Sequence, residues 1–176
     1  MKKAFAVLLA GFLIALPATV AQDKKDPEKK EPAKKTAEDA RQEKLKELFQ
    51  DFGKAVGKAK SQAEFDAGAA KVAKEHLPRV LELLKADSKD DVAMELCVYA
   101  ILGLKTDDKT VLDTMNAFTK TDKINGFVQE VMTGAPDSAK PILEKVLADN
   151  PNKDTKGFAC YGLGQLYFGK EDKDSA

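Results

Sequence analysis

The chain has 176 residues, of which 33% are charged and 43% hydrophobic, a composition typical of one globular domain with a well-solvated surface. Lysine plus arginine equals aspartate plus glutamate at 29 each, and there is no tryptophan. No nucleic-acid partner is expected, because such a partner requires a clustered basic surface and often aromatic platforms for base stacking.

The N-terminus has the features of a cleavable secretory signal peptide over residues 1–21. Lys2 and Lys3 form a positive segment, and Ala4 to Leu16 is an unbroken apolar run. Ala18 to Ala21 then offers small residues for a signal peptidase, so we expect cleavage at its end. An uncleaved membrane anchor is the alternative, but a membrane-spanning helix needs roughly 20 apolar residues. The mature chain is therefore predicted to be exported, periplasmic or secreted, without stable membrane insertion. Gln22 follows the site in place of a cysteine, so no lipid attachment is expected.

Residues 22–40 are predicted to form a disordered charged linker. Lysines and acidic residues alternate in short blocks, Pro27 and Pro32 interrupt them, and no apolar side chain is larger than alanine. Such a segment cannot bury enough surface to offset the entropy of ordering it. Contact with acidic lipids is the alternative, but the interleaved carboxylates nearly cancel the field of the lysines.

Two helices are predicted next, over residues 41–57 and 62–77, because apolar residues recur in both at spacings of three and four. The spacing of a capping box precedes or opens each helix, at Thr36 to Asp39 and at Ser61 to Glu64. Pro78 is expected to kink or end the second helix, because proline has no backbone N–H to donate.

Internal self-similarity predicts the rest of the domain. Three matching stretches begin at Val80, Val111 and Ile142, which are 31 residues apart. Each opens a helix that a polar break separates from a second apolar segment, giving three copies at residues 79–104, 110–133 and 141–168.

One helix pair cannot bury its apolar face alone, so successive pairs are expected to stack. We therefore predict an all-α fold over residues 41–170, built from stacked antiparallel helix pairs as a TPR-like superhelix with a period of about 31 residues. The two helices before Pro78 form a degenerate fourth pair in this scheme, and residues 171–176 are predicted to be a flexible tail. The tryptophan, tyrosine and proline consensus positions of true tetratricopeptide repeats are not met. Small residues are expected to let neighbouring helices approach closely at Gly53, Gly57, Gly126, Gly157, Gly162 and Gly164.

The polar breaks contain two acidic pairs, Asp90-Asp91 and Asp107-Asp108, which would also suit calcium binding or acid–base chemistry. Each pair comes just before a helix, where a carboxylate caps free N–H groups, so we expect capping. The calcium loop of an EF-hand needs alternating oxygen ligands and a glycine, and this pattern is absent from the sequence. Asp149 to Asn152 predicts a turn between two helices.

His76 is the only histidine, so any Ser-His-Asp or Cys-His system would depend on it. Because Pro78 follows closely, we expect His76 at a helix end, capping carbonyls or facing water. Zinc needs three or four closely spaced ligands, which one histidine and two distant cysteines do not supply. We therefore expect no catalytic residue, no metal ligand and no cofactor.

Cys97 and Cys160 are 63 residues apart, about twice the repeat length. Equivalent positions two repeats apart would be separated by roughly 16–20 Å, whereas a disulfide requires Cα atoms within about 7 Å. Both cysteines lie in apolar runs, so we expect buried free thiols. The absence of a CxxC motif excludes thioredoxin-type exchange within this chain.

The last predicted helix is apolar on several sides, whereas a repeat array normally ends in a polar outer face. We expect this helix to contact a protein or peptide partner, self-association with a second copy included. The residues proposed for the contact are Tyr161, Leu166, Tyr167 and Phe168. The alternatives are that a downstream domain covers this side or that it turns inward and leaves nothing exposed.

Two runs, LEKVLADNP at Leu143 to Pro151 and GFACYGLGQL at Gly157 to Leu166, resemble a helical region of secreted bacterial TlpA-like/redoxin (thioredoxin-like) proteins. The resemblance covers roughly residues 40–170, and the signal peptide, linker and helix pairs follow in the same order. In that family a downstream domain with a CxxC-type site carries the redox chemistry. No such site is present here, so the resemblance implies an architecture and transfers no redox residue.

The favoured function is that of an exported, non-catalytic helical-repeat module that mediates protein–protein interaction in the cell envelope. The alternative is the accessory helical region of a thiol–disulfide oxidoreductase whose catalytic domain lies outside this chain. A hydrolase that uses His76 is a third and less favoured alternative.

Overall fold

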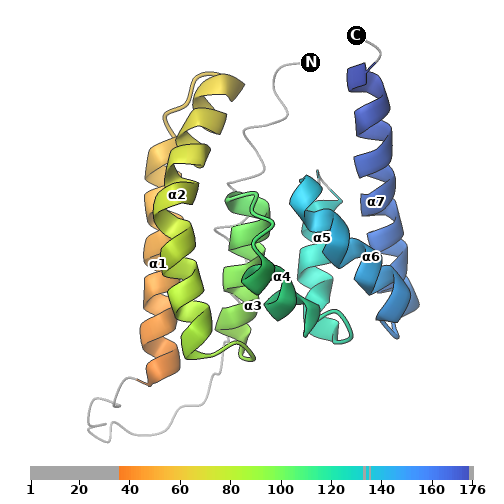
Figure 1. Ribbon diagram of the computed structural model, residues 1–176, viewed down its shortest axis with the longest axis horizontal. Helices are drawn as coiled ribbons and strands as arrows, with labels where there is room; N and C mark the ends of the chain where they lie inside the picture. Colours follow the sequence, from red (N-terminus) through yellow and green to blue (C-terminus); the bar gives the residue numbers. More distant parts are fainter. Residues whose placement is uncertain (1–35, 133, 135, 175–176) are drawn as a thin grey trace, which may run out of the picture. The chain divides into compact units, whose positions relative to one another are not determined.

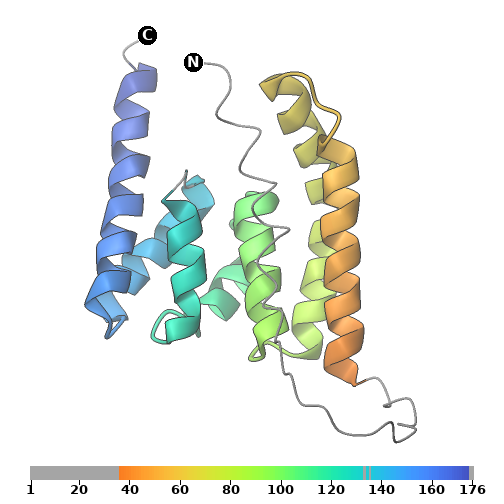
Figure 2. The ribbon, with the colours of Figure 1, turned by 180° about the vertical axis from the view of Figure 1, so that it is seen from behind.

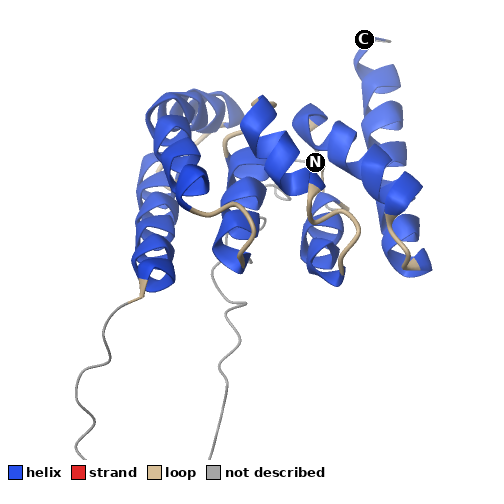
Figure 3. Cartoon of the chain, turned by 60° about the horizontal axis from the view of Figure 1, so that its bottom comes forward, coloured by secondary structure: helices blue, strands red, loops and turns tan. Residues whose placement is uncertain are grey.

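The computed structural model describes residues 36–132, 134 and 136–174, and every regular element within them is helical (Figures 1 and 3). The all-α prediction is therefore confirmed for this part of the chain. The predicted signal peptide and residues 22–35 of the predicted linker lie outside the described residues. The elements in chain order are α1 (Ala37–Val56), α2 (Gln62–Ala86), α3 (Asp91–Val98), the π-helical turn η2 (Tyr99–Gly103), α4 (Lys109–Asn116), the 3₁₀ turn η3 (Asp122–Ile124), α5 (Asn125–Val131), the 3₁₀ turn η4 (Asp137–Ala139), α6 (Lys140–Asp149) and α7 (Lys153–Asp174).

Helices α1 and α2 form an antiparallel pair that lies side by side in both views of the ribbon (Figures 1 and 2). The capping box of Thr36 and Asp39 is complete and starts α1 at Ala37, so the helix covers the last four residues assigned to the linker. The Ser61 side chain accepts from the Glu64 backbone N–H, while the Glu64 carboxylate accepts from the Lys60 N–H at 2.7 Å. Thr36 and Ser61 therefore cap these helices as predicted, although α1 begins four residues before the predicted start at residue 41 and the Glu64 carboxylate binds the Lys60 N–H in place of the Ser61 N–H.

Pro78 does not end α2, which runs without a break from Gln62 to Ala86. The proline removes the N–H that would bond the carbonyl of Lys74. Both Pro78 and Lys74 lie on the exposed side of the helix, where water can bind that carbonyl. The helices predicted as 62–77 and from residue 79 onward are consequently one helix.

Helix α3 and the turn η2 are the most deeply buried segment of the domain. Nearly every residue from Val92 to Ile101 is buried, and the segment packs against α1, α2 and α4. The π-turn shifts the hydrogen-bond register, and the Ser138 hydroxyl donates to the carbonyl of Ile101 at 3.0 Å. Ser138 from η4 therefore ties the C-terminal half of the domain to this central segment.

The C-terminal half consists of α4, α5, α6 and α7. Helix α6 packs on α7 and α4, and α5 packs on α7. Val80, Val111 and Ile142, the first residues of the three matching stretches, are all fully buried. The buried side chains from α1 to α7 form one continuous hydrophobic cluster. Figure 2 shows α1 and α7 on opposite sides of this row of helices.

The boundaries and the glycines differ from expectation in two respects. Helix α7 extends to Asp174, so residues 171–174 of the predicted tail are helical. A Cβ added at Gly162 would lie 3.2 Å from Leu143 Cδ1, as expected for close helix packing, and one at Gly57 would meet the Gly53 carbonyl of its own helix. The close-approach prediction is wrong for four glycines, where an added Cβ would meet nothing within 4 Å: Gly53, Gly126, Gly157 and Gly164.

None of the described helices is both long enough and apolar enough to cross a membrane.

Candidate functional site

His76 lies in the middle of α2 and is 4% exposed, so the prediction that it caps a helix end or faces water is wrong. Its Nδ1 is 2.7 Å from the hydroxyl of Tyr99, which is itself 3.5 Å from the carbonyl oxygen of Leu48. Phe49 and Phe52 pack edge-on against the Tyr99 ring. Continuation of the helix past Pro78 turns His76 toward this aromatic cluster between α1, α2 and η2.

The surroundings of His76 favour its neutral form. Burial lowers the pKa of His76 below its usual value of 6.5, and the nearby Arg79 cation lowers it further, while Asp51 and Glu75 act in the opposite direction. Burial likewise raises the pKa of Tyr99, so its hydroxyl keeps its proton. Histidine and tyrosine therefore form a neutral, hydrogen-bonded pair at neutral pH.

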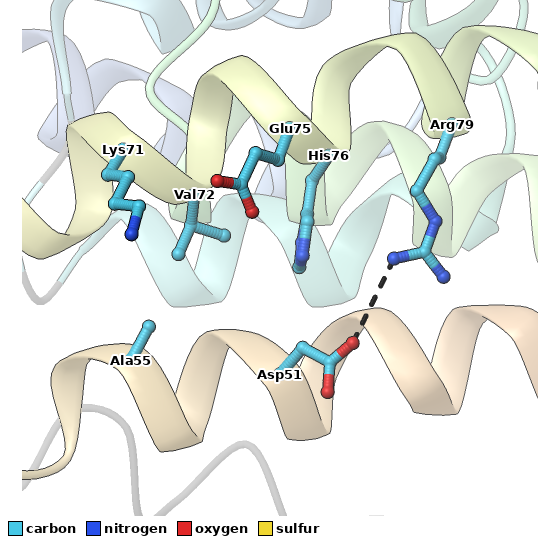
Figure 4. A pocket seen from close by; sticks show the side chains of 7 residues that line it. All are labelled: Asp51, Ala55, Lys71, Val72, Glu75, His76 and Arg79. Carbon is cyan, nitrogen blue, oxygen red and sulfur yellow. Dashed lines mark ion pairs between the residues drawn. The ribbon is translucent and has the colours of Figure 1, made fainter.

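A hollow of about 420 Å³ opens beside this pair on the surface of α1 and α2 (Figure 4). Asp51 and Ala55 line it from α1, and the other lining residues belong to α2: Lys71, Val72, Glu75, His76 and Arg79. Arg79 lies 3.8 Å from the Asp51 carboxylate. Two cationic and two acidic side chains thus offset each other around the opening.

The hollow lacks the parts of a nucleophilic active site, since its lining contains no serine, threonine or cysteine for His76 to activate. Within the described residues, no group of three or more His, Cys, Asp or Glu side chains is arranged to hold a metal ion. The hollow can accommodate water and small polar groups.

The two cysteines are free, and only Cys97 is buried. Its Sγ lies 3.6 Å from the carbonyl oxygen of Val111, and burial raises the pKa of the thiol to about 12. Cys160 is exposed, so the prediction of a buried thiol is wrong at this position. Helix α7 packs on α5 and α6 through Ala159 and Leu163, and Cys160 lies outside this packed side.

The four residues predicted to contact a partner do not share one environment. Tyr161 is 51% exposed, Tyr167 is 52% exposed and Phe168 is 73% exposed. Leu166 is only 9% exposed, because it points with Leu163 into the core, so its assignment to a contact surface is wrong. The Lys140 ammonium lies 4.9 Å from the centre of the Tyr167 ring, and the Gln165 amide donates to the Tyr161 hydroxyl at 2.8 Å.

The side of α7 that faces away from the core forms what we call the outer α7 face, made of Gly157, Cys160, Tyr161, Gly164, Gln165 and Phe168. All are exposed except Gly164, which is half-buried. A Cβ added at Gly157 or at Gly164 would have no other atom within 4 Å. No charged residue occurs between positions 157 and 168, in a chain of which one third is charged. This face is the candidate functional site, because exposed aromatic groups without charges mark binding surfaces.

Sequence reasoning found the aromatic residues of this face but missed its glycines and Cys160. The signal was available in the seven-residue spacing of Gly157 and Gly164, which equals the spacing of Tyr161 and Phe168. Residues seven apart share one side of a helix, so both pairs belong to the same stripe.

Comparison of the chain with protein-family models, with curated proteins and with solved structures finds no match. The resemblance to the helical region of TlpA-like/redoxin proteins accordingly stays a prediction.

Proposed function

We propose that the chain is an exported, non-catalytic helical-repeat module that binds another protein in the cell envelope. The observation that carries the proposal is the outer α7 face, on which Tyr161 and Phe168 are largely exposed and no charge is present. Tyrosine and phenylalanine are enriched at protein interfaces, because they bury a large area with few rotatable bonds.

The alternation of helices supports the repeat part of the proposal. In chain order the end of α2 is followed by α3, α4 by α5, and α6 by α7, and each first helix buries the residue that opens a matching stretch. Helix α3 packs on α2, and α7 packs on α6. We propose that these pairs are TPR-like repeats of about 31 residues. Helical repeats present extended surfaces to peptides and proteins, which fits a binding role.

Site-specific photo-crosslinking in cells that export the chain tests this function. A photoreactive phenylalanine analogue at position 168 should yield protein adducts, and the same analogue at Lys46 on the exposed side of α1 should not. Adducts from neither position, or equally from both, would contradict a binding role for the outer α7 face. The mass of the exported chain checks the signal peptide in the same experiment, with Gln22 expected as the first residue.

A further inference from the structure

The glycines and aromatic residues of the outer α7 face alternate with a symmetric spacing. Gly157, Tyr161, Gly164 and Phe168 are separated by four, three and four residues. With 100° per residue, these four positions fall within roughly 60° of one another around the helix, in a narrow seam. The seam points away from the buried side of α7, which contains Ala159, Leu163 and Leu166.

The order of glycines and aromatic residues along the seam makes it complementary in shape to the same seam on a second, antiparallel α7. When a second α7 is laid antiparallel, Phe168 of one chain meets Gly157 of the other, and Tyr161 meets Gly164. Each aromatic ring therefore faces a glycine, and no ring faces a ring. Both glycines leave open space for a ring, because an added Cβ would touch nothing within 4 Å. In a parallel arrangement each residue would meet its own copy, so Phe168 would be set against Phe168.

Charge and area also permit this contact. Two copies can approach without like-charge repulsion along the seam, because residues 157–168 carry no charge. Tyr161 and Phe168 together expose about 250 Å² of aromatic surface per chain, since a whole aromatic side chain presents 150–250 Å². A contact limited to one seam of a single helix is expected to bury less than the ~1,200 Å² typical of stable interfaces, which corresponds to a weak, reversible dimer.

We infer that the partner bound by the outer α7 face is a second copy of this chain, with the two α7 helices antiparallel and related by a two-fold axis between residues 162 and 163. The inference rests on the proposed function and narrows it to self-association. The interface is isologous: residue i of one chain contacts residue j of the other, and j contacts i. We expect a weak dimer with a dissociation constant on the order of 10 µM, a value that the concentration series below covers.

The first test measures the mass in solution of the chain expressed from its complete sequence and purified after export. Light scattering should show a rise from one chain to two between about 1 µM and 1 mM, the range that brackets the expected constant. Gly164→Leu should remain at the mass of one chain throughout, because the leucine occupies the space of the partner's Tyr161. Gly126→Leu is the matched control, since Gly126 in α5 is exposed and also faces open space, and it should dimerise like the natural chain. Circular dichroism establishes that both variants are folded.

The second test determines the direction of the helices by disulfide cross-linking of chains in which Cys160→Ser removes the exposed thiol. In the proposed dimer, a cysteine at position 164 lies about 6 Å from its copy across the axis, within disulfide range. A cysteine at position 157 lies roughly 16 Å from its copy along the helix. Gly164→Cys should therefore cross-link and Gly157→Cys should not, whereas a parallel dimer would cross-link both.

The inference is overturned if the natural chain keeps the mass of one chain up to 1 mM, if Gly164→Leu dimerises as the natural chain does, or if both cysteine variants cross-link equally. A monomeric chain that still forms photo-adducts with other proteins at position 168 would overturn self-association and leave the proposed function standing. A dimer with the predicted cross-links whose photo-adducts contain only this chain would support both.

Discussion

At the scale of single residues, the domain is organised by two polar side chains that helices bring into its interior. His76 is hydrogen-bonded to Tyr99, and Arg41 forms an ion pair with Asp90 and donates to the carbonyl of Asp87 at 2.6 Å. Each contact joins segments that are more than 20 residues apart in the chain. Buried polar groups of this kind stabilise a fold only while their partners are present.

The pKa of His76 makes the stability of the fold dependent on pH. Burial keeps the folded-state pKa below 6.5, so the unfolded chain binds a proton at a higher pH than the folded chain does. The contribution of neutral His76 to the free energy of unfolding is therefore complete above about pH 6.5 and is lost as the pH falls through the folded-state pKa of His76. The free energy of unfolding, measured by urea titration at pH 7.5, 6.5 and 5.5, should fall more steeply in the natural chain than in His76→Gln. Equal pH dependence in the two proteins would contradict this account.

Arg41→Met should lower the free energy of unfolding by about 3 kcal/mol, because it leaves the Asp90 carboxylate and the Asp87 carbonyl without their partner. The Asp90 side chain is 19% exposed, so water compensates only in part. Asp90 also caps α3 by accepting from the Ala93 N–H at 2.7 Å.

Asp90→Asn is the companion variant, because asparagine retains the cap and removes the charge. In the double variant Arg41→Met/Asp90→Asn, the free energy of unfolding should decrease by less than the sum of the decreases in the two single variants. A double-mutant cycle measured by urea unfolding tests this. Strict additivity would mean that the ion pair contributes nothing.

At the scale of elements, α7 has two apolar sides with opposite roles. One side packs on α5 and α6 through Ala159, Gly162, Leu163 and Leu166, and the other is the outer α7 face. Two of its glycines therefore differ in what surrounds them. A Cβ at Gly162 would press on Leu143 and on Val131 Cγ2 at 3.3 Å, whereas a Cβ at Gly164 would meet open space.

Gly162→Leu should destabilise the fold by about 2 kcal/mol or more, because the buried neighbours cannot make room. Gly164→Leu should be neutral or stabilise by up to about 1 kcal/mol, because leucine is the better helix former. Thermal or urea unfolding at low micromolar concentration, where the chain is expected to be monomeric, measures both. Similar decreases in the free energy of unfolding of the two variants would mean that other residues of the same chain cover the outer α7 face.

At the scale of the whole domain, one hydrophobic cluster runs from α1 to α7, and polar links cross between its parts. Asn150 forms one of these links in the C-terminal half. Its side-chain amide is buried, donates to the carbonyl of Thr119 at 2.6 Å, and accepts from the Asn152 N–H at 2.9 Å. The loop before α7 is thereby anchored to the segment after α4.

A continuous core predicts one cooperative unfolding transition for the described helices. Far-UV circular dichroism reports all helices, and the near-UV signal is expected to be dominated by Tyr99, the only tyrosine that is buried among the described residues. Asn150→Asp replaces the amide donor by a charged carboxylate, which leaves the Thr119 carbonyl without its hydrogen bond. The unfolding midpoints of the far-UV and near-UV signals should both shift to lower urea concentration by the same amount, although residue 150 is remote in sequence from Tyr99. A shift confined to the far-UV signal would show that the two halves unfold separately.

The all-α class could be predicted from sequence, because helical periodicity and capping depend on residues three or four positions apart. Thr36, Ser61, Asp90 and Asp108 cap helices as predicted, and Asp149 to Asn152 forms the predicted turn between α6 and α7. The helical assignment of these segments required no knowledge of what they pack against.

Which side of each helix is buried could not be predicted from sequence and depends on how the helices pack together. Helix α7 is apolar on both sides, so its periodicity could not tell the buried Leu166 from the exposed Phe168 or place Cys160 outside the core. Arg41, His76 and Asn150 likewise bind Asp90, Tyr99 and Thr119, which are 23 to 49 residues away along the chain. Such contacts depend on how the helices stack, and stacking depends on side-chain packing over the whole core, which a local pattern does not encode.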